Sequence, residues 1–251
     1  MPNTIIERLN TDLKNLANAI QVRIPSPELI GITESTDALF SLTRNALVQV
    51  PETVCPSDYR ILAIQLFSCF EHAWVGAIRS ALLGHIDEAF SNMRRALELF
   101  GSSYLLLRLA KNMRPKDVVI AITNTTTMRN QLGSSKIPSA KWLTKEIGIC
   151  AEHGAHGNDK SFSLRILPQT IRKGVDGRME SRSTVLYCHH DPILAMTVVV
   201  KFAEYVFSVA TIVADDVIRN SGLALISQLD ESRAQLNDAC KAARLAIKDW
   251  K

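Results

Sequence analysis

The strongest constraint on the fold is a pair of long helical segments separated by two residues. Residues 58–83 and 86–112 carry apolar side chains at intervals of three and four, and Gly84 and His85 link them. Such spacing is typical of α-helices, and a short link that contains glycine turns the chain back on itself. The sequence therefore predicts a mainly α protein, a helical bundle with a central, long antiparallel helical hairpin.

The two segments differ in how their apolar residues are distributed. Residues 58–83 are apolar almost all round, so we expect this helix at the centre of the bundle. Its polar exceptions recur near helical spacing and form one narrow stripe: Gln65, Ser68, His72 and Arg79. Residues 86–112 have one apolar face and one polar face, as expected for a helix that packs on one side.

Further segments of helical periodicity extend the bundle on both sides of the hairpin. They cover residues 4–20, 34–50, 117–123, 138–150, 192–220 and 223–249, whereas residues 123–135 fit either a loop or a polar helix. Pro25 and Pro27 are expected to end the first of these helices. We expect a single helical domain over residues 1–251, with residues 1–50 as an N-terminal helical appendage.

A different pattern occupies residues 161–190. Phe162, Leu164 and Ile166 alternate with polar residues, which is the two-residue period of a strand. Asp176-Gly177 is a turn signal, and the stretch STVLYC that follows is rich in residues that favour strands. The sequence predicts a small β-hairpin inserted into the bundle here.

Composition and charge restrict the class of protein. The chain has 251 residues, of which 47% are hydrophobic and 22% charged, as in a soluble domain with a sizeable core. The formal net charge of +4 comes from scattered Lys and Arg, which permits binding to nucleic acid without indicating it. The most apolar stretch, residues 192–214, contains Lys201 and Glu204, both costly in a bilayer, so we expect no membrane span.

Cysteine usage and the start of the chain bear on localisation. The five cysteines are odd in number, widely spaced and without a CxxC pair, which favours a reducing compartment. The first residues mix acidic and apolar side chains, unlike a secretory signal. We expect a cytoplasmic protein.

The densest group of chemically active side chains lies in CAEHGAHGND, residues 150–159. Thiolates and imidazoles are ligands for zinc, and a second group further along could complete a site in a metal-dependent hydrolase. The two groups comprise Cys150, Glu152, His153 and His156, and Cys188, His189, His190 and Asp191. The favoured interpretation is instead a helix end closed by Gly154 or Gly157, because no known zinc spacing is present. We therefore predict no metal and no cofactor.

Arg94 and Glu98 form a second candidate pair, four residues apart on the polar face of residues 86–112. One interpretation is an ion pair that stabilises the helix by a few tenths of a kcal/mol. The other places the pair in a polar pocket with His72, which with Glu71 lies in the middle of the apolar segment 58–83. Polar side chains buried there must find partners or reach a cavity.

Arg79 and His85 form a third candidate pair, and Arg182 and His189 have similar spacing. An arginine followed closely by a histidine resembles the motif of helical nucleases of the HEPN superfamily, in which the two act on a scissile RNA phosphate. The alternative is a surface arginine and a turn histidine. The alternative is favoured because His85 falls in the tight link between two helices.

Longer stretches resemble a bacterial helical family akin to the HEPN and abortive-infection proteins. These stretches are RSALLGHIDEAFSNMRRALELFGSSYLLL, AEHGAHGN and the segment 192–220, which lie within a span of about half of the chain. The positions that match the family pattern are Gly84, Glu88, Ala89, Arg94, Glu98, His156, Gly157 and Asn158. The family has no settled activity, so the resemblance implies fold more than function.

The resemblance favours a defence or stress protein and, if the protein is an enzyme, cleavage of RNA without a metal. In this hypothesis His156 is the acid/base, Arg94 holds a phosphate and Glu98 orients one of them. A competing hypothesis is a non-catalytic module that binds a protein partner or forms a homodimer. The spatial relation of His156 to Arg94 and His72 separates the two.

Overall fold

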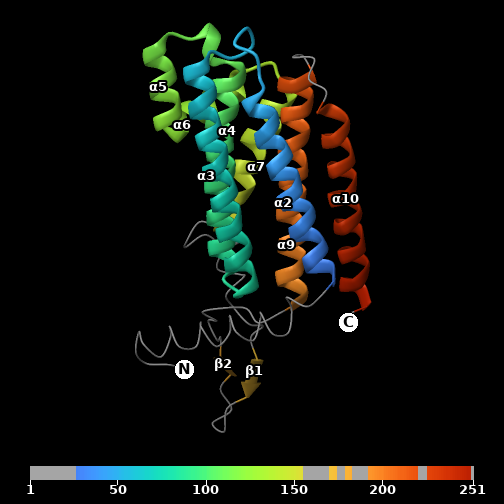
Figure 1. Cartoon of the computed structure of the whole chain (residues 1–251). Coiled ribbons are helices and arrows are strands. Elements are labelled where there is room, and N and C mark those ends of the chain that lie inside the picture. The colour runs from blue at the N-terminus through green and yellow to red at the C-terminus, as the bar shows by residue number, and fades with distance from the viewer. Residues whose placement is uncertain (1–26, 155–169, 174–178, 183–191, 220–224, 250–251) are drawn as a thin grey trace, which may run out of the picture.

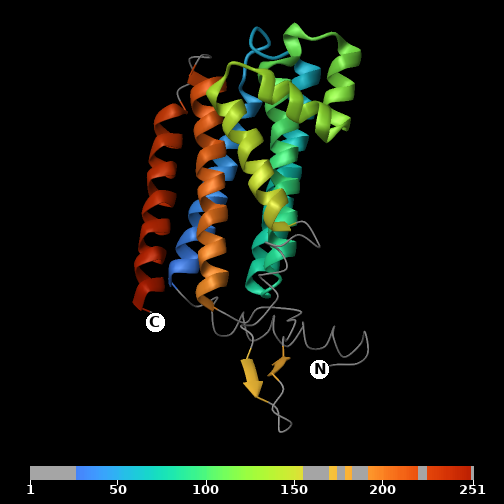
Figure 2. The same cartoon turned by 180° about the vertical axis from the view of Figure 1, so that it is seen from behind.

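The computed structural model describes residues 27–154, 170–173, 179–182, 192–219 and 225–249, and this part of the chain is an all-α bundle with one short strand pair. Its long helices lie side by side, with two short helices, α5 and α6, at one end (Figures 1 and 2). The helices are α2 (Pro27–Val48), α3 (Ser57–Leu82), α4 (Ile86–Arg108), α5 (Pro115–Thr123), α6 (Thr125–Ser134), α7 (Pro138–Gly154), α9 (Pro192–Ile212) and α10 (Ile226–Asp249). A 3-10 turn, η1 (Ala110–Asn112), follows α4, and a π-helical turn, η2 (Val213–Ile218), continues α9.

The most deeply buried helix is α4, not α3. Residues 101–107 of α4 are all buried, and the helix packs against α3, α6, α7 and α9. In α3, by contrast, Ile61 and Val75 are 56% and 57% exposed. The expectation that α3 lies at the centre is therefore wrong, because its nearly uniform apolarity includes a face open to solvent. The polar stripe predicted along α3 does lie on this outer face.

The connection between α3 and α4 depends on Gly84. Its φ of 82° closes the end of α3 in the left-handed region, and the His85 amide then donates to Ser80 O at 2.9 Å. Two further bonds join the helices. Asn92 Nδ2 donates to Ser80 Oγ at 3.2 Å near the link, and Ser103 Oγ donates to Ala63 O at 2.8 Å far from it.

Aromatic rings fill the core between α2, α3 and α4. Phe40 of α2 packs edge-on against Phe70 and Trp74 of α3, with ring centroids 5.5 Å apart in both pairs. Trp74 also donates from Nε1 to Phe202 O at 3.1 Å, which ties α3 to α9. The rings thus contribute both apolar burial and a directional bond between helices.

Several predicted boundaries change in the structure. Helix α2 begins at Pro27 rather than residue 34, because proline is well suited to the first turn of a helix. Residues 125–134 form the polar helix rather than the loop, capped by Asn124, whose Oδ1 accepts from Thr127 N at 2.9 Å. The predicted helix at residues 4–20 lies outside the described residues.

The strands are short. β1 (Thr170–Lys173) pairs antiparallel with β2 (Met179–Arg182). Most of residues 161–190 lie outside the described part of the chain, so the inserted hairpin stays a prediction.

Two segments, Ser57–Leu82 and Ile193–Ile218, are long and apolar enough to cross a membrane by length and composition. The core helices of soluble proteins pass the same test, and most of Ile193–Ile218 is buried inside the bundle. The absence of a membrane span therefore stays a prediction.

Gly84→Ala is expected to lower the free energy of unfolding by about 1–2 kcal/mol, because the new Cβ clashes in the left-handed conformation. The matched control is Gly133→Ala in α6, where an added Cβ meets Thr144 at an ordinary 3.8 Å and should raise the free energy of unfolding by up to about 1 kcal/mol. Urea unfolding measures both. Equal effects of the two substitutions would contradict the role given to Gly84.

Candidate functional site

Polar side chains from α4, α7 and α9 lie close together, partly buried in the apolar core and partly at its solvent-exposed edge. Each helix contributes two of them, four residues apart and therefore on one face of that helix. The six residues are Arg94 and Glu98 of α4, Glu146 and Cys150 of α7, and Lys201 and Tyr205 of α9. We call this group the α4–α7–α9 cluster.

The innermost part of the cluster consists of three buried polar groups. The Cys150 thiol lies 3.8 Å from the Tyr205 hydroxyl and donates to it. The Glu146 carboxyl is close enough to Tyr205 to raise the pKa of its hydroxyl. Glu146 is 7% exposed, and its Oε2 is buried without a hydrogen-bond partner among the described residues. A buried carboxylate oxygen in this state is costly, so it is suited to accept a bond from a bound group.

Burial controls the protonation of Cys150 and Tyr205. It raises the pKa of the Cys150 thiol to about 12, against smaller opposing effects of Tyr205, Lys201 and Arg94. It also raises the pKa of Tyr205, with further increases from Cys150 and Glu146. Both groups are therefore neutral near pH 7, and Cys150 is not a thiolate nucleophile.

Two cations border these groups on their outer side. Arg94 Nε donates to Glu98 Oε1 at 2.8 Å, with the side chains 41% and 19% exposed. Lys201 Nζ lies 4.8 Å from the centre of the Tyr205 ring. The predicted contact between Arg94 and Glu98 is therefore present. It fits both the helix-stabilising and the pocket interpretation.

His156 lies outside the described residues, but the helix that leads to it is well defined. Helix α7 ends at Gly154, whose carbonyl accepts from Ser91 Oγ at 2.6 Å. Ser91 is three residues before Arg94, so the end of α7 lies one helical turn from that guanidinium. The His153 ring packs on Phe90, with centroids 4.8 Å apart.

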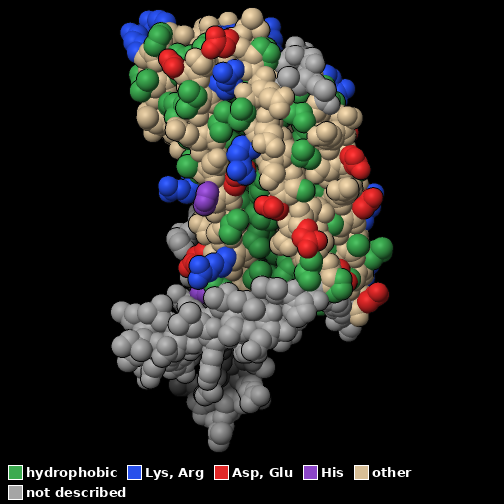
Figure 3. Space-filling model, viewed as in Figure 1, with side chains coloured by type: hydrophobic (Ala, Val, Ile, Leu, Met, Phe, Trp, Pro, Cys, Tyr) green, Lys and Arg blue, Asp and Glu red, His purple; other side chains and the backbone are tan. Residues whose placement is uncertain are grey.

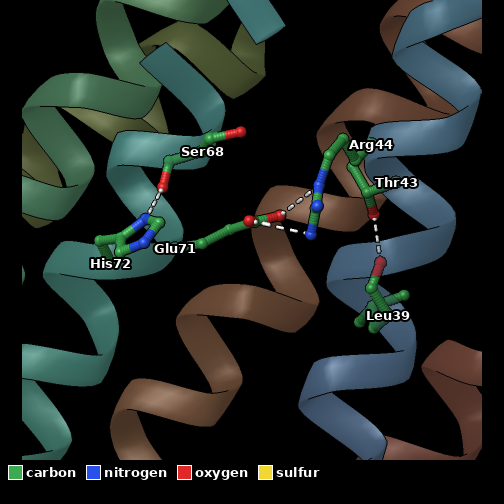
Figure 4. Close-up of polar contacts among 6 residues, drawn as sticks. All are labelled: Leu39, Thr43, Arg44, Ser68, Glu71 and His72. Carbon is green, nitrogen blue, oxygen red and sulfur yellow. Dashed lines mark hydrogen bonds and ion pairs between the residues drawn. The ribbon is translucent and has the colours of Figure 1, made fainter. Parts of the chain in front are cut away.

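Glu71 and His72 make contacts elsewhere. Glu71 Oε2 is 3.0 Å from Arg44 Nη2, an ion pair that joins α3 to α2 in front of α9 (Figure 4). His72 is exposed, and its Nδ1 lies 2.8 Å from Ser68 O on its own helix. No contact found among the described residues joins either side chain to Arg94.

The structure describes the third candidate pair, Arg79 and His85, and some of the residues of the proposed metal site. Arg79 is exposed, whereas His85 is 6% exposed in the link between helices, 3.7 Å from Glu88 Oε2. Within the described residues, no group of three or more His, Cys, Asp or Glu could hold a metal ion. His156 and residues 188–191 lie outside that part of the chain.

Sequence reasoning missed Glu146 and Tyr205.

Comparison of the chain with protein-family models, with curated proteins and with solved structures found no match in any of the three. The functional argument therefore rests on the residues of this chain.

Cys150 is expected to react very slowly with iodoacetamide in the folded protein at about pH 8.5, where a free cysteine is half ionised. Exposed Cys69 should react quickly under the same conditions. Peptide mass spectrometry measures both rates, and denaturation should make them similar. Comparable rates in the folded state would contradict the burial of the Cys150 thiol.

Gly154→Ala is expected to destabilise the fold by about 1–3 kcal/mol, because the new Cβ would lie 2.6 Å from the Ser91 backbone nitrogen. Gly148→Ala is the matched control in the same helix, since its Cβ meets Arg129 at an ordinary 3.8 Å. The control should be neutral or stabilising. Thermal unfolding of both variants tests whether the end of α7 is pressed against α4.

Proposed function

We propose that the α4–α7–α9 cluster binds a phosphate of RNA and that the protein cleaves RNA without a metal, in a bacterial defence or stress response. One observation carries the proposal. The Arg94 guanidinium is held by Glu98 at 2.8 Å while its side chain stays 41% exposed. An arginine fixed in this way can present its planar donors to a phosphate at little entropic cost.

In this proposal the two cations of the cluster, Arg94 and Lys201, hold the anion, and Glu98 and Glu146 balance their charge in the free protein. Lys201 lies 4.8 Å from the centre of the Tyr205 ring, and the Tyr205 hydroxyl accepts from Cys150. The bond from Arg94 to Glu98 uses Nε, and no contact of its terminal nitrogens is found among the described residues. Glu98 thus orients the guanidinium rather than covering it.

The proposed scaffold is the antiparallel hairpin of α3 and α4. It is supported by the bonds from Asn92 to Ser80 and from Ser103 to Ala63, which join opposite ends of the two helices. Helix α7 then ends against Ser91. His156, the proposed acid/base, is two residues after Gly154 in the sequence.

The proposed reaction is internal transesterification. His156 takes the proton from a ribose 2′-hydroxyl, whose oxygen attacks the adjacent phosphorus. The bond from phosphorus to the 5′-oxygen breaks, and His156 returns the proton to that leaving oxygen, which yields a 2′,3′-cyclic phosphate. Arg94 stabilises the negative charge that builds on the phosphoryl oxygens. DNA lacks the 2′-hydroxyl and should not be cleaved.

The test is cleavage of labelled single-stranded RNA by the full chain in the presence of EDTA. Arg94→Ala and His156→Ala should each lower the cleavage rate by about 100-fold or more. Glu98→Gln, which keeps the size of the side chain, should have a smaller effect. Arg95→Ala is the matched control, because Arg95 is an exposed neighbour on the same helix.

Three outcomes would overturn the proposal. Unchanged cleavage by Arg94→Ala would remove the phosphate-binding role. Loss of activity in EDTA, restored by zinc, would indicate the metal-dependent hydrolase. Absence of both RNA binding and cleavage in the wild-type chain would leave the non-catalytic interaction module.

A further inference from the structure

The outer face of α3 carries exposed apolar side chains among polar ones. We call it the α3 face. Its exposed residues recur every three or four positions and so lie along one side of the helix: Asp58, Ile61, Gln65, Cys69, His72, Val75 and Arg79. Ile61 and Val75 are each more than half exposed. Viewed from the side of α2 and α3, hydrophobic side chains form scattered patches on the surface (Figure 3).

This exposure has a cost that the described residues of one chain do not relieve. Helix α3 is apolar enough to pass the length and composition test for a membrane span, yet only a minority of that stretch is buried in the bundle. Apolar surface covered by a partner gains about 25 cal/mol per Å². Exposed apolar side chains interspersed with polar ones and bordered by charges, as on the α3 face, are compatible with an interaction surface.

We propose that the α3 face binds a second copy of this chain, with the two α3 helices antiparallel and the two-fold axis passing between Ser68 and Cys69. In such a pair, residues equally far before and after the axis lie at the same level. The proposal is independent of RNA cleavage. It rests on how well the residues at matching levels complement one another.

Charge complementarity decides the orientation. Asp58, in the first turn of α3, lies level with Arg79 of the partner subunit, in the last turn. By symmetry this contact occurs twice, once at each end of the interface. Both side chains are exposed in the single chain. In a parallel pair the like charges would instead face each other, Asp58 against Asp58 and Arg79 against Arg79, which is unfavourable.

Shape and hydrogen bonding favour the same arrangement. Gly76 has open space around its Cβ direction, with nothing within 4 Å, and it lies level with the partner's Ile61. The bulky exposed side chain of one copy therefore meets the gap on the other. Nearer the axis, Gln65 lies level with the partner's His72, and an amide and an imidazole can bond to each other. Helix α3 spans about 32 Å between Asp58 and Arg79, enough for several such layers.

Cys69 provides a reporter at the axis. It is free and exposed, whereas Cys55, Cys150 and Cys240 are buried. In the proposed dimer the two Cys69 residues lie beside the two-fold axis, where a disulfide between the chains can form. Cys188 lies outside the described residues, so the cross-linking experiment uses the full chain with Cys188→Ser. Mild oxidation should give a covalent dimer, and the further substitution Cys69→Ser should abolish it.

The decisive experiment is sedimentation of the full chain at micromolar concentration. The wild type should be a dimer, and Asp58→Arg or Arg79→Asp should each raise the dissociation constant about tenfold, because each creates two repulsive contacts. The double variant Asp58→Arg with Arg79→Asp should restore the dimer. Val75→Glu should give monomers. Its matched control, Leu245→Glu on α10, replaces a residue that is 62% exposed and should leave the dimer intact.

The results that overturn the proposal are equally specific. A monomeric wild type, or equal effects of Val75→Glu and Leu245→Glu, would exclude the α3 face as the interface. A dimer that forms without a Cys69 cross-link and is not restored by the double charge reversal would exclude the antiparallel register. Binding of a monomeric wild type to phosphatidylcholine vesicles, lost in Val75→Glu, would assign the face to a lipid surface instead.

Discussion

The bundle depends on the burial of α4 on almost every side. A helix in this position must bring small residues to its neighbours and must satisfy each polar group that it carries. Gly101 meets the first need, since a Cβ there would lie 2.9 Å from Met128 Sδ of α6. Ser103 and Tyr104 meet the second. Ser103 bonds to the α3 backbone, and Tyr104 donates to Asp216 Oδ2 at 2.7 Å in the π-helical turn η2. The polar contacts of α4 thus fix how α3 and α9 pack on it.

The candidate site lies where α4 is no longer fully buried. At Arg94 and Glu98, the polar face of α4 reaches solvent. The following turns of the helix are enclosed by the neighbouring helices. The groups behind this polar face, Cys150, Tyr205 and Glu146, are buried, and burial keeps Cys150 and Tyr205 neutral. A guanidinium at the edge of a low-dielectric interior interacts with an anion more strongly than the same group on an open surface. This contrast gives Arg94 its proposed role.

The sequence predicts where the helices begin and end better than it predicts which helices pack against one another. The starts of α3, α4 and α7 and the turn between α3 and α4 follow from apolar spacing, from Gly84 and from Pro138, all of which are local signals, whereas α4 ends at Arg108 rather than at residue 112. The hydrogen bond from Cys150 to Tyr205 and the interaction of Tyr205 with Glu146 join helices that are distant in the chain, so no spacing rule could reveal them. The position of α3 was misjudged for a related reason. Apolar composition shows that a surface is to be covered but not whether the same chain covers it.

The α3 face and the α4–α7–α9 cluster lie on different sides of the molecule. Helix α3 is at the front of Figure 1, whereas α7 is at the front of the reverse view in Figure 2, with α4 between them. A dimer formed through α3 therefore holds its two clusters on outer surfaces, away from the two-fold axis. It does not bring Arg94 of both copies to one phosphate. If both proposals hold, each chain must contain a complete site, and dimerisation must serve to stabilise α3 or to present two sites to one long RNA.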